Sequence, residues 1–192
     1  MQVHADSSNF AAGVGKKEAY EQVIEQATAL FDGQRNWVCI PKNKKIIKQE
    51  HNTSNTASLL WHALHALPRP SSAVNWAGFY VLDPSASSTG KQQLILGPFQ
   101  GKVACQTIAF GRGVCGAAAA SGRTQLVPDV ELFPGHIACD GESRSEVVVP
   151  ILVEGKVVAI IDIDCAEPDG FDEVDREYLE RLAGILGEGC DW

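Results

Sequence analysis

Two adjacent runs rich in valine and isoleucine restrict the fold of this chain more than any other feature. They cover residues 147–153 and 156–163, and the dipeptide Glu154-Gly155 lies between them. β-Branched side chains favour the pleated surface of a sheet, and a short linker that ends in glycine favours a tight hairpin. The sequence therefore predicts a sheet whose strongest part is this antiparallel hairpin.

Further elements are predicted along the rest of the chain. Short apolar runs bounded by Gly, Pro, Asp or Ser predict strands over residues 75–82, 92–96, 105–109 and 124–127. Apolar residues that recur every three or four positions predict helices. These helices cover residues 16–31, a stretch from a cap at Asn55 or Thr56 to just before Pro68, and a stretch from a cap at Asp172 to residue 186.

This order of elements predicts an α+β fold. A central antiparallel sheet would carry the N- and C-terminal helices together on one face and a ligand pocket on the other. The chain has 192 residues, enough to bury a core of its own. We expect a single domain over residues 16–192, a flexible N-terminus at residues 1–15, and a lysine-bearing surface insertion at about residues 41–56.

The charge of the chain argues against two classes of partner. The formal net charge is −8 at pH 7, whereas binding to nucleic acid or to an anionic membrane surface relies on basic patches. No apolar run approaches the roughly 20 residues of a membrane span, and the first residues lack the apolar region of a secretory signal. We therefore expect a cytoplasmic protein that binds neither nucleic acid nor membrane.

The cysteines are candidates for redox chemistry. The chain has six: Cys39, Cys105, Cys115, Cys139, Cys165 and Cys190. In a reducing compartment they are packed thiols, metal ligands or redox groups rather than structural disulfides. Three of them, Cys105, Cys115 and Cys139, lie in the loop-rich middle, where gaps of nine and 23 residues lack the close ligand pairs of a zinc site. No bound metal is expected, and packing and redox work both stay open for these thiols.

Two of these cysteines have surroundings that favour reactivity. Cys139 follows a loop that contains proline and glycine, residues 133–140, and such loops often hold reactive groups. Cys115 lies in a glycine-rich turn that opens an alanine-rich helix, which Gly122 closes. In contrast, Cys165 points to the opposite side of its strand from the neighbouring aspartate and is expected to be a packed thiol.

Three acids occupy unusual positions in the predicted hairpin. Glu146 lies at its start, and Asp162 and Asp164 lie among isoleucines on one face of its second strand. The ordinary interpretation is a solvated outer face. A strict two-residue turn would place Glu146 opposite Ile163, away from both aspartates. A three-residue turn with Gly155 left-handed would instead place Glu146 opposite Asp162.

A bulge near Pro150, which cannot donate to the strand ladder, would shift the register equally well. We therefore predict a bulge somewhere in the hairpin, with all three acids facing the same cavity as Cys139.

Six segments of the chain, taken in order, closely resemble the free methionine-(R)-sulfoxide reductase family. The segments are residues 75–80, 97–102, 111–116, 127–130, 133–140 and 145–150, and the resemblance extends over roughly residues 16–186. It implies a GAF fold, in which Cys139 matches the cysteine that attacks the sulfoxide, Cys105 matches the usual resolving cysteine, and Cys115 matches a third cysteine of less settled role.

The resemblance also implies how the substrate is held. Glu146, Asp162 and Asp164 match the substrate-pocket acids, so the functional interpretation replaces that of a solvated face. Glu146 and Asp164 would lie nearest the sulfoxide oxygen and Asp162 nearer the α-ammonium group, while Trp76 and Tyr80 would wall the apolar side chain. His136 would serve in a structural hydrogen bond rather than as a general base.

The implied reaction is the reduction of free L-methionine-(R)-sulfoxide through a cysteine sulfenic acid and an intramolecular disulfide. Thioredoxin, supplied with electrons by NADPH, would reopen the disulfide; no bound cofactor is needed, and a homodimer is expected. The alternatives are a non-catalytic GAF domain that senses a small molecule or redox state, and a plain interaction module. Neither explains why Cys139, Cys105 and the acids occur together. The long insertion, Cys39 and Cys190 have no counterpart in the family pattern.

Overall fold

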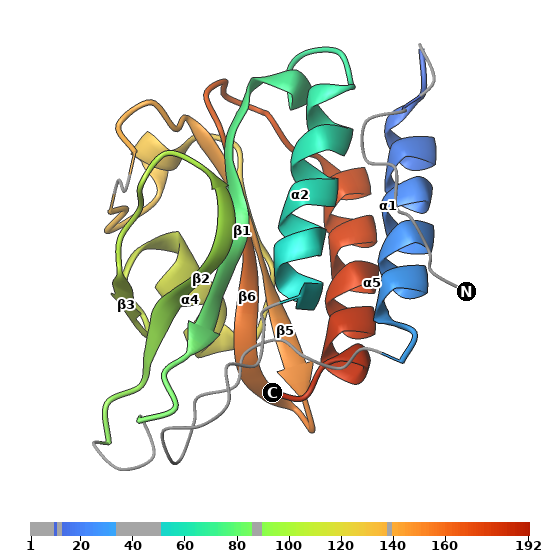
Figure 1. Ribbon diagram of the computed structural model, residues 1–192. Helices are drawn as coiled ribbons and strands as arrows, with labels where there is room; N and C mark the ends of the chain where they lie inside the picture. The colour runs from blue at the N-terminus through green and yellow to red at the C-terminus, as the bar shows by residue number, and fades with distance from the viewer. Residues whose placement is uncertain (1–9, 11–12, 34–50, 86–89, 138–139) are drawn as a thin grey trace.

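The computed structural model describes residues 10, 13–33, 51–85, 90–137 and 140–192 (Figure 1). The predicted α+β fold is confirmed. The helices are α1 (Lys16–Phe31), α2 (His51–His65), α4 (Gly113–Ser121) and α5 (Glu173–Gly189), with short 3-10 turns at Ser71–Ala73 and Val130–Leu132. The strands are β1 (Val74–Leu82), β2 (Gln93–Gly101), β3 (Thr107–Ala109), β4 (Gln125–Val127), β5 (Ser145–Val153) and β6 (Lys156–Cys165).

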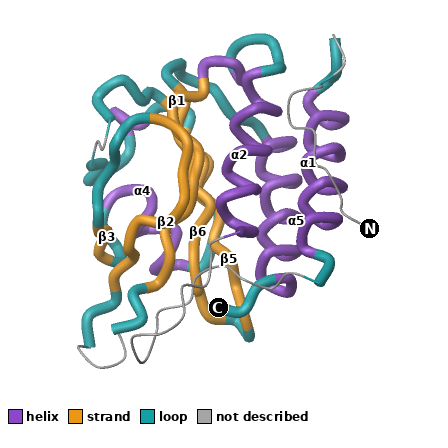
Figure 2. The backbone as a smooth tube through the Cα atoms, in the orientation of Figure 1, coloured by secondary structure: helices purple, strands orange, loops and turns teal. Residues whose placement is uncertain are grey.

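The strands form one antiparallel sheet of six, in the order β3-β2-β1-β6-β5-β4. Helices α2 and α5 cover one face, and α1 packs on the outer side of these two helices (Figures 1 and 2). The terminal helices thus share one face, as predicted, and α2 joins them there. Helix α4 lies on the other face. Among the described helices, none is long and apolar enough to span a membrane.

Each face of the sheet has its own apolar core, because successive strand residues point to opposite faces. Ile161 and Ile163 of β6 are fully buried in the core beneath α2 and α5. Ile160 and Val148 belong to the smaller core beneath α4. The same alternation sends Asp162, next to Ile161, to the α4 side. The burial of Ile161 and Ile163 beneath α2 and α5 therefore places the acids on the face that carries α4.

The hairpin between β5 and β6 turns through two residues. Glu154 and Gly155 both have positive φ angles, 51° and 74°, which suits a two-residue turn between twisted strands. The register then shifts between Ile151 and Leu152, so that Ile151 pairs with Ala159 and Val158 is the extra residue. The predicted bulge is confirmed, and it lies beside Pro150 rather than in the turn. The three-residue turn considered from the sequence is wrong.

This bulge sets the partners of the acids. Glu146 lies opposite Asp164, and Val148 lies opposite Asp162. The pairing of Glu146 with Asp162 that the three-residue turn implied is therefore wrong, although the consequence is the same. One extra residue in either strand brings Glu146 to the face of both aspartates.

The starts of two helices test the predicted caps. Asp172 caps α5 as predicted, and its side chain accepts hydrogen bonds from the backbone of Val174 and Asp175. The predicted cap of α2 at Asn55 or Thr56 is wrong, because the helix already begins at His51. Thr56 is buried within the helix, and its hydroxyl donates to the carbonyl of Asn52 at 2.7 Å. The predicted insertion at 41–56 therefore overlaps α2 at its end; residues 41–50 lie outside the described residues.

Candidate active site

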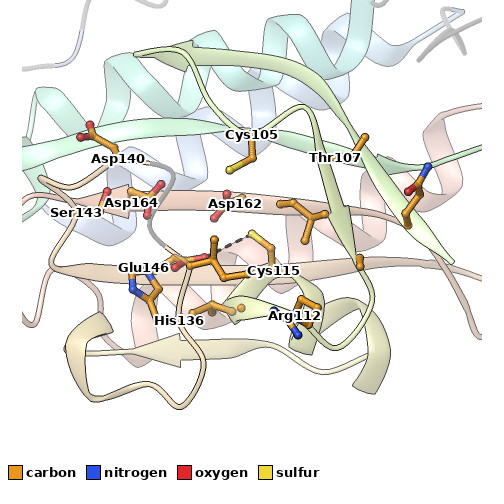
Figure 3. A pocket seen from close by; sticks show the side chains of 16 residues that line it. Cys105, Thr107, Arg112, Cys115, His136, Asp140, Ser143, Glu146, Asp162 and Asp164 are labelled. Carbon is orange, nitrogen blue, oxygen red and sulfur yellow. Dashed lines mark hydrogen bonds between the residues drawn. The ribbon is translucent and has the colours of Figure 1, made fainter. Parts of the chain in front are cut away.

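A cavity of about 320 Å³ opens on the α4 face of the sheet (Figure 3). Strands β3, β5 and β6, the start of α4 and the loop before β5 all contribute to its wall. Its polar and sulfur-bearing lining residues are Gln93, Cys105, Thr107, Arg112, Cys115, His136, Asp140, Ser143, Glu146, Asp162 and Asp164. Segments far apart in the sequence thus bring thiol and carboxyl groups into one space.

The three acids predicted from the sequence lie together in this cavity. Glu146 and Asp162 are only 6% and 5% exposed, and Asp164 is partly buried. The interpretation of a solvated outer face is therefore wrong, because α4 and the surrounding loops cover this side of the sheet. Buried carboxyl groups without a countercharge favour the protonated form.

Burial and mutual repulsion change the acidity of all three groups. The pKa of Glu146 is raised well above its usual range by burial and by the charges of Asp162 and Asp164. The pKa of Asp164 is also raised well above its usual range, by burial and by Asp162. Burial raises the pKa of Asp162 to about 6, while the neighbouring side chains of Cys115 and Glu146 favour its ionised form. Near neutral pH the cluster therefore holds proton donors beside one carboxylate.

Cys115 lies against this cluster from the first turn of α4. It is 7% exposed, and its Sγ donates a hydrogen bond to Oε1 of Glu146 at 3.5 Å (Figure 3). Burial and the neighbouring acids raise the pKa of this thiol well above its usual range. Cys115 is therefore a protonated thiol at neutral pH, and a protonated thiol is a poor nucleophile.

The turn before α4 fixes the position of Cys115. The predicted glycine-rich turn is confirmed: Gly113 has a φ of 64°, and Gly122 closes the helix in the left-handed conformation. Gly116 packs directly against the end of β3, where a Cβ atom would lie 2.4 Å from the carbonyl oxygen of Ala109. This close approach ties the first turn of α4 to the sheet edge.

Cys105 lines the same cavity and is disulfide-bonded. The described free cysteines are Cys115, Cys165 and Cys190, so the partner of Cys105 lies outside the described residues. Cys139, predicted as the attacking residue, and Cys39 both fall outside them. Asp140, the residue after Cys139, lines the cavity.

The remaining cysteines lie away from the cavity. Cys165 and Cys190 are 0% and 3% exposed in the core beneath the helices. The prediction that Cys165 is a packed thiol is therefore confirmed.

Trp76 and Tyr80 border the acids rather than the main cavity. Both are buried, their rings stack at 5.7 Å, and Trp76 lies opposite Asp164 in the sheet. They line a small neighbouring cavity of about 10 Å³ together with Asp162 and Asp164. The two aromatic residues thus form an apolar wall immediately behind the acid cluster.

Arg112 is a lining residue that sequence reasoning did not select. Among the described residues it is the one lysine or arginine that lines the cavity, and it lies across the cavity from Asp140 (Figure 3). Its place in the glycine-rich turn before α4 is the sequence signal that could have identified it. The cavity is therefore polarised, with carboxyl groups on one side and a guanidinium group on the other.

His136 is a neutral group of the cavity wall. It is partly buried, and burial lowers the pKa of its imidazole. A neutral imidazole neither repels a substrate ammonium group nor attracts its carboxylate strongly. The structural hydrogen bond predicted for His136 stays a prediction.

One subset of the cavity residues has the composition of a metal site. The ligand atoms of Cys115, Glu146 and Asp162 all lie within 4.8 Å of one another. The sequence spacing gave no hint of this, because the three residues come from α4, β5 and β6.

The fold agrees with that of known proteins. A GAF domain model matches residues 53–189. The free methionine-R-sulfoxide reductase of Saccharomyces cerevisiae is 50% identical over 97% of this chain and 94% of its own length. The X-ray structure of the free methionine-R-sulfoxide reductase from Neisseria meningitidis with its substrate is 38% identical, covers 94% of this chain and 93% of that one, and has a TM-score of 0.77. The chain therefore belongs to the free methionine-(R)-sulfoxide reductase family of GAF-domain enzymes.

Proposed function

We propose that this chain reduces free L-methionine-(R)-sulfoxide to methionine with its own thiols. One observation carries the proposal: the disulfide-bonded Cys105 and the three acids line a single cavity. A sulfoxide oxygen leaves only when it is protonated, so the reaction needs a thiol and a proton donor at one place. Two carboxyl groups with strongly raised pKa values meet that need.

The substrate would lie across the polarised cavity. Its α-ammonium group would pair with the carboxylate of Asp162, and Arg112 would hold its α-carboxylate. Trp76 and Tyr80, which line the small neighbouring cavity, would support the acid cluster from behind. Both termini of a free amino acid are thereby used, which would exclude methionine sulfoxide within a peptide.

The chemistry would run in two balanced steps. The sulfur of Cys139 attacks the sulfoxide sulfur, Glu146 or Asp164 gives a proton to the oxygen, and the thiol proton of Cys139 restores that carboxyl group. The hydroxyl group then passes from the substrate sulfur to the sulfur of Cys139, so that methionine leaves and Cys139 becomes a sulfenic acid. The thiol of Cys105 then displaces water from that sulfenic acid and forms a disulfide. The sulfoxide loses its oxygen, and two thiols lose two electrons and two protons.

The state of the cysteines is compatible with this order. Cys105 is disulfide-bonded in the described structure, and we assign Cys139 as its partner because the neighbouring Asp140 lines the same cavity. Cys115 is a free, protonated thiol that contacts Glu146. It would hold the proton donor in place first and exchange with the disulfide afterwards.

The reductant, the oligomeric state and the compartment are proposed from the family resemblance. Thioredoxin, reduced with electrons from NADPH, would reopen the disulfide, with no cofactor bound. We propose that residues 16–192 act as one GAF domain, as a homodimer in the cytoplasm.

The test is an assay with racemic free methionine sulfoxide, thioredoxin, thioredoxin reductase and NADPH, with chiral analysis of the sulfoxide that remains. The expected result is consumption of the R epimer alone and little NADPH oxidation with a sulfoxide-containing peptide. Equal consumption of both epimers would contradict the proposal. Ligand binding without NADPH oxidation would favour the non-catalytic sensor instead.

A further inference from the structure

The cavity contains a negative group with an unused ligand atom. Oδ1 of Asp162 is buried and has no hydrogen-bond partner within the described residues. A buried carboxylate oxygen without a partner is costly, because water no longer solvates it. Among the described residues, the charged neighbours of Asp162 are the acids Glu146 and Asp164. A positive group that enters the cavity would therefore gain a strong ligand at this atom.

The groups beside the Asp162 carboxyl group are ligands that suit a particular class of cation. Sγ of Cys115 and a carboxylate oxygen of Glu146 lie 3.5 Å apart, and both lie within 4.8 Å of an oxygen of Asp162. Tetrahedral zinc with sulfur and oxygen ligands needs ligand separations of about 3.4 to 3.7 Å. A small closure of the three side chains would reach that geometry, and the open cavity supplies water for the fourth position.

We propose that Cys115, Glu146 and Asp162 form a binding site for a thiophilic divalent cation such as Zn²⁺, and that the bound ion blocks the cavity to substrate. The sulfur ligand favours Zn²⁺, Cd²⁺ or Co²⁺ over Mg²⁺ and Ca²⁺, which prefer oxygen ligands alone. Binding releases the thiol proton of Cys115 and the carboxyl proton of Glu146 to solvent, so the ion binds more tightly as the pH rises. The blocking effect rests on the proposed function, whereas the binding does not.

The ion would act as a reversible inhibitor rather than as a cofactor. It would occupy Asp162, which the proposed reaction uses for the substrate ammonium group, and it would remove the acidic proton of Glu146. Substrate and ion therefore compete for the same groups.

The experiment titrates Co²⁺ into the oxidised full-length protein, in which the disulfide of Cys105 leaves Cys115 as the free thiol among the described cavity residues. A thiolate-to-cobalt charge-transfer band in the near ultraviolet reports sulfur ligation directly. We expect one Co²⁺ per chain, displaced by Zn²⁺ but not by Mg²⁺. The band should disappear in Cys115→Ser and persist in the matched control Cys165→Ser.

Asp162→Asn keeps the thiol and tests the oxygen ligand separately. Loss of a first ligand should weaken Co²⁺ binding by at least about tenfold, since even a supporting partner of a ligand costs that much. Circular dichroism of each variant checks the fold. Absence of the band in the wild-type protein, its persistence in Cys115→Ser, or displacement of Co²⁺ by Mg²⁺ would overturn the site.

Competition is measured in the same solution, without any reductant. There, free methionine-(R)-sulfoxide should weaken the cobalt band. In the separate reductase assay with thioredoxin and NADPH, Zn²⁺ should raise the KM without changing kcat. A band that saturating substrate leaves unchanged would refute the blocking effect. Since Co²⁺ binding needs no turnover, its failure and a failure of the reductase activity give different results.

Discussion

Replacement of Asp162 by asparagine is expected to stabilise the fold at neutral and alkaline pH and to leave it unchanged in acid. The side chain is 5% exposed, and burial raises its pKa from the ordinary 3.8 to about 6. The folded protein therefore binds this proton more tightly than the unfolded chain does. Such a group contributes stability below pH 3.8, and this stability is lost as the pH rises through about 6.

The magnitude follows from the difference between the two pKa values. One pKa unit corresponds to about 1.4 kcal/mol, so ionisation of Asp162 destabilises the fold by about 3 kcal/mol at pH 8. The uncharged asparagine removes this cost. For a protein of this size the gain corresponds to a rise in Tm of roughly 6 to 12 °C.

The assay is thermal unfolding of the reduced protein at pH 4 and pH 8. We expect Asp162→Asn to match the wild-type Tm at pH 4 and to exceed it at pH 8. Asp169→Asn, an exposed aspartate with a φ of 52° that asparagine tolerates, is the matched control and should change neither value. A Tm that is lower than the wild-type value at pH 8 would refute the reasoning from uncompensated burial.

Three other changes test the proposed chemistry and the architecture. Glu146→Gln removes the proton but keeps the shape, and should lower the rate of methionine release by about 10²- to 10⁴-fold. Because burial and the neighbouring acids raise the pKa of Glu146, the linkage argued for Asp162 predicts that Tm rises at neutral pH in this variant as well. A rate of methionine release near that of the wild type would assign the proton to another acid. Cys139→Ser should release no methionine, whereas Cys105→Ser should release about one equivalent and then stall, as counted by single-turnover chromatography; a normal first turnover in Cys139→Ser would refute the assignment. Gly116→Ala should lower Tm, because its Cβ would lie 2.4 Å from a carbonyl oxygen at the end of β3. The control Gly141→Ala should not, because its Cβ would meet nothing within 4 Å. Equal Tm values for the two variants would show that the start of α4 can move away from β3 at little cost.

The sequence by itself determined the elements whose signals are local. The three- and four-residue spacing predicted α1 over residues 16–31, and Asp172 was identified as the cap of α5. Alternation along β6 placed Asp162 and Asp164 on one face, because this period is a property of any extended strand. The start of α2 was misjudged, because Thr56 favours caps in general but here bonds to a carbonyl within its own helix.

The family resemblance supplied the candidate residues but not their environment. It pointed to Glu146, Asp162 and Asp164 as pocket acids, whereas their strand positions alone favoured a solvated face. Only the covering by α4 and its neighbouring loops excludes water from them. The raised pKa values follow from this burial, which depends on segments distant in the sequence.

Only the tertiary structure decided how the acids meet. The sequence required an extra residue somewhere in the hairpin but did not say where. The two-residue turn and the register shift after Ile151 make Val158 that residue and set Glu146 opposite Asp164. The local backbone could form either a three-residue turn or a bulge, so the packing of both sheet faces determines which of the two occurs. The same long-range packing brings Arg112 and Cys115 to the acids, which no spacing along the chain could reveal.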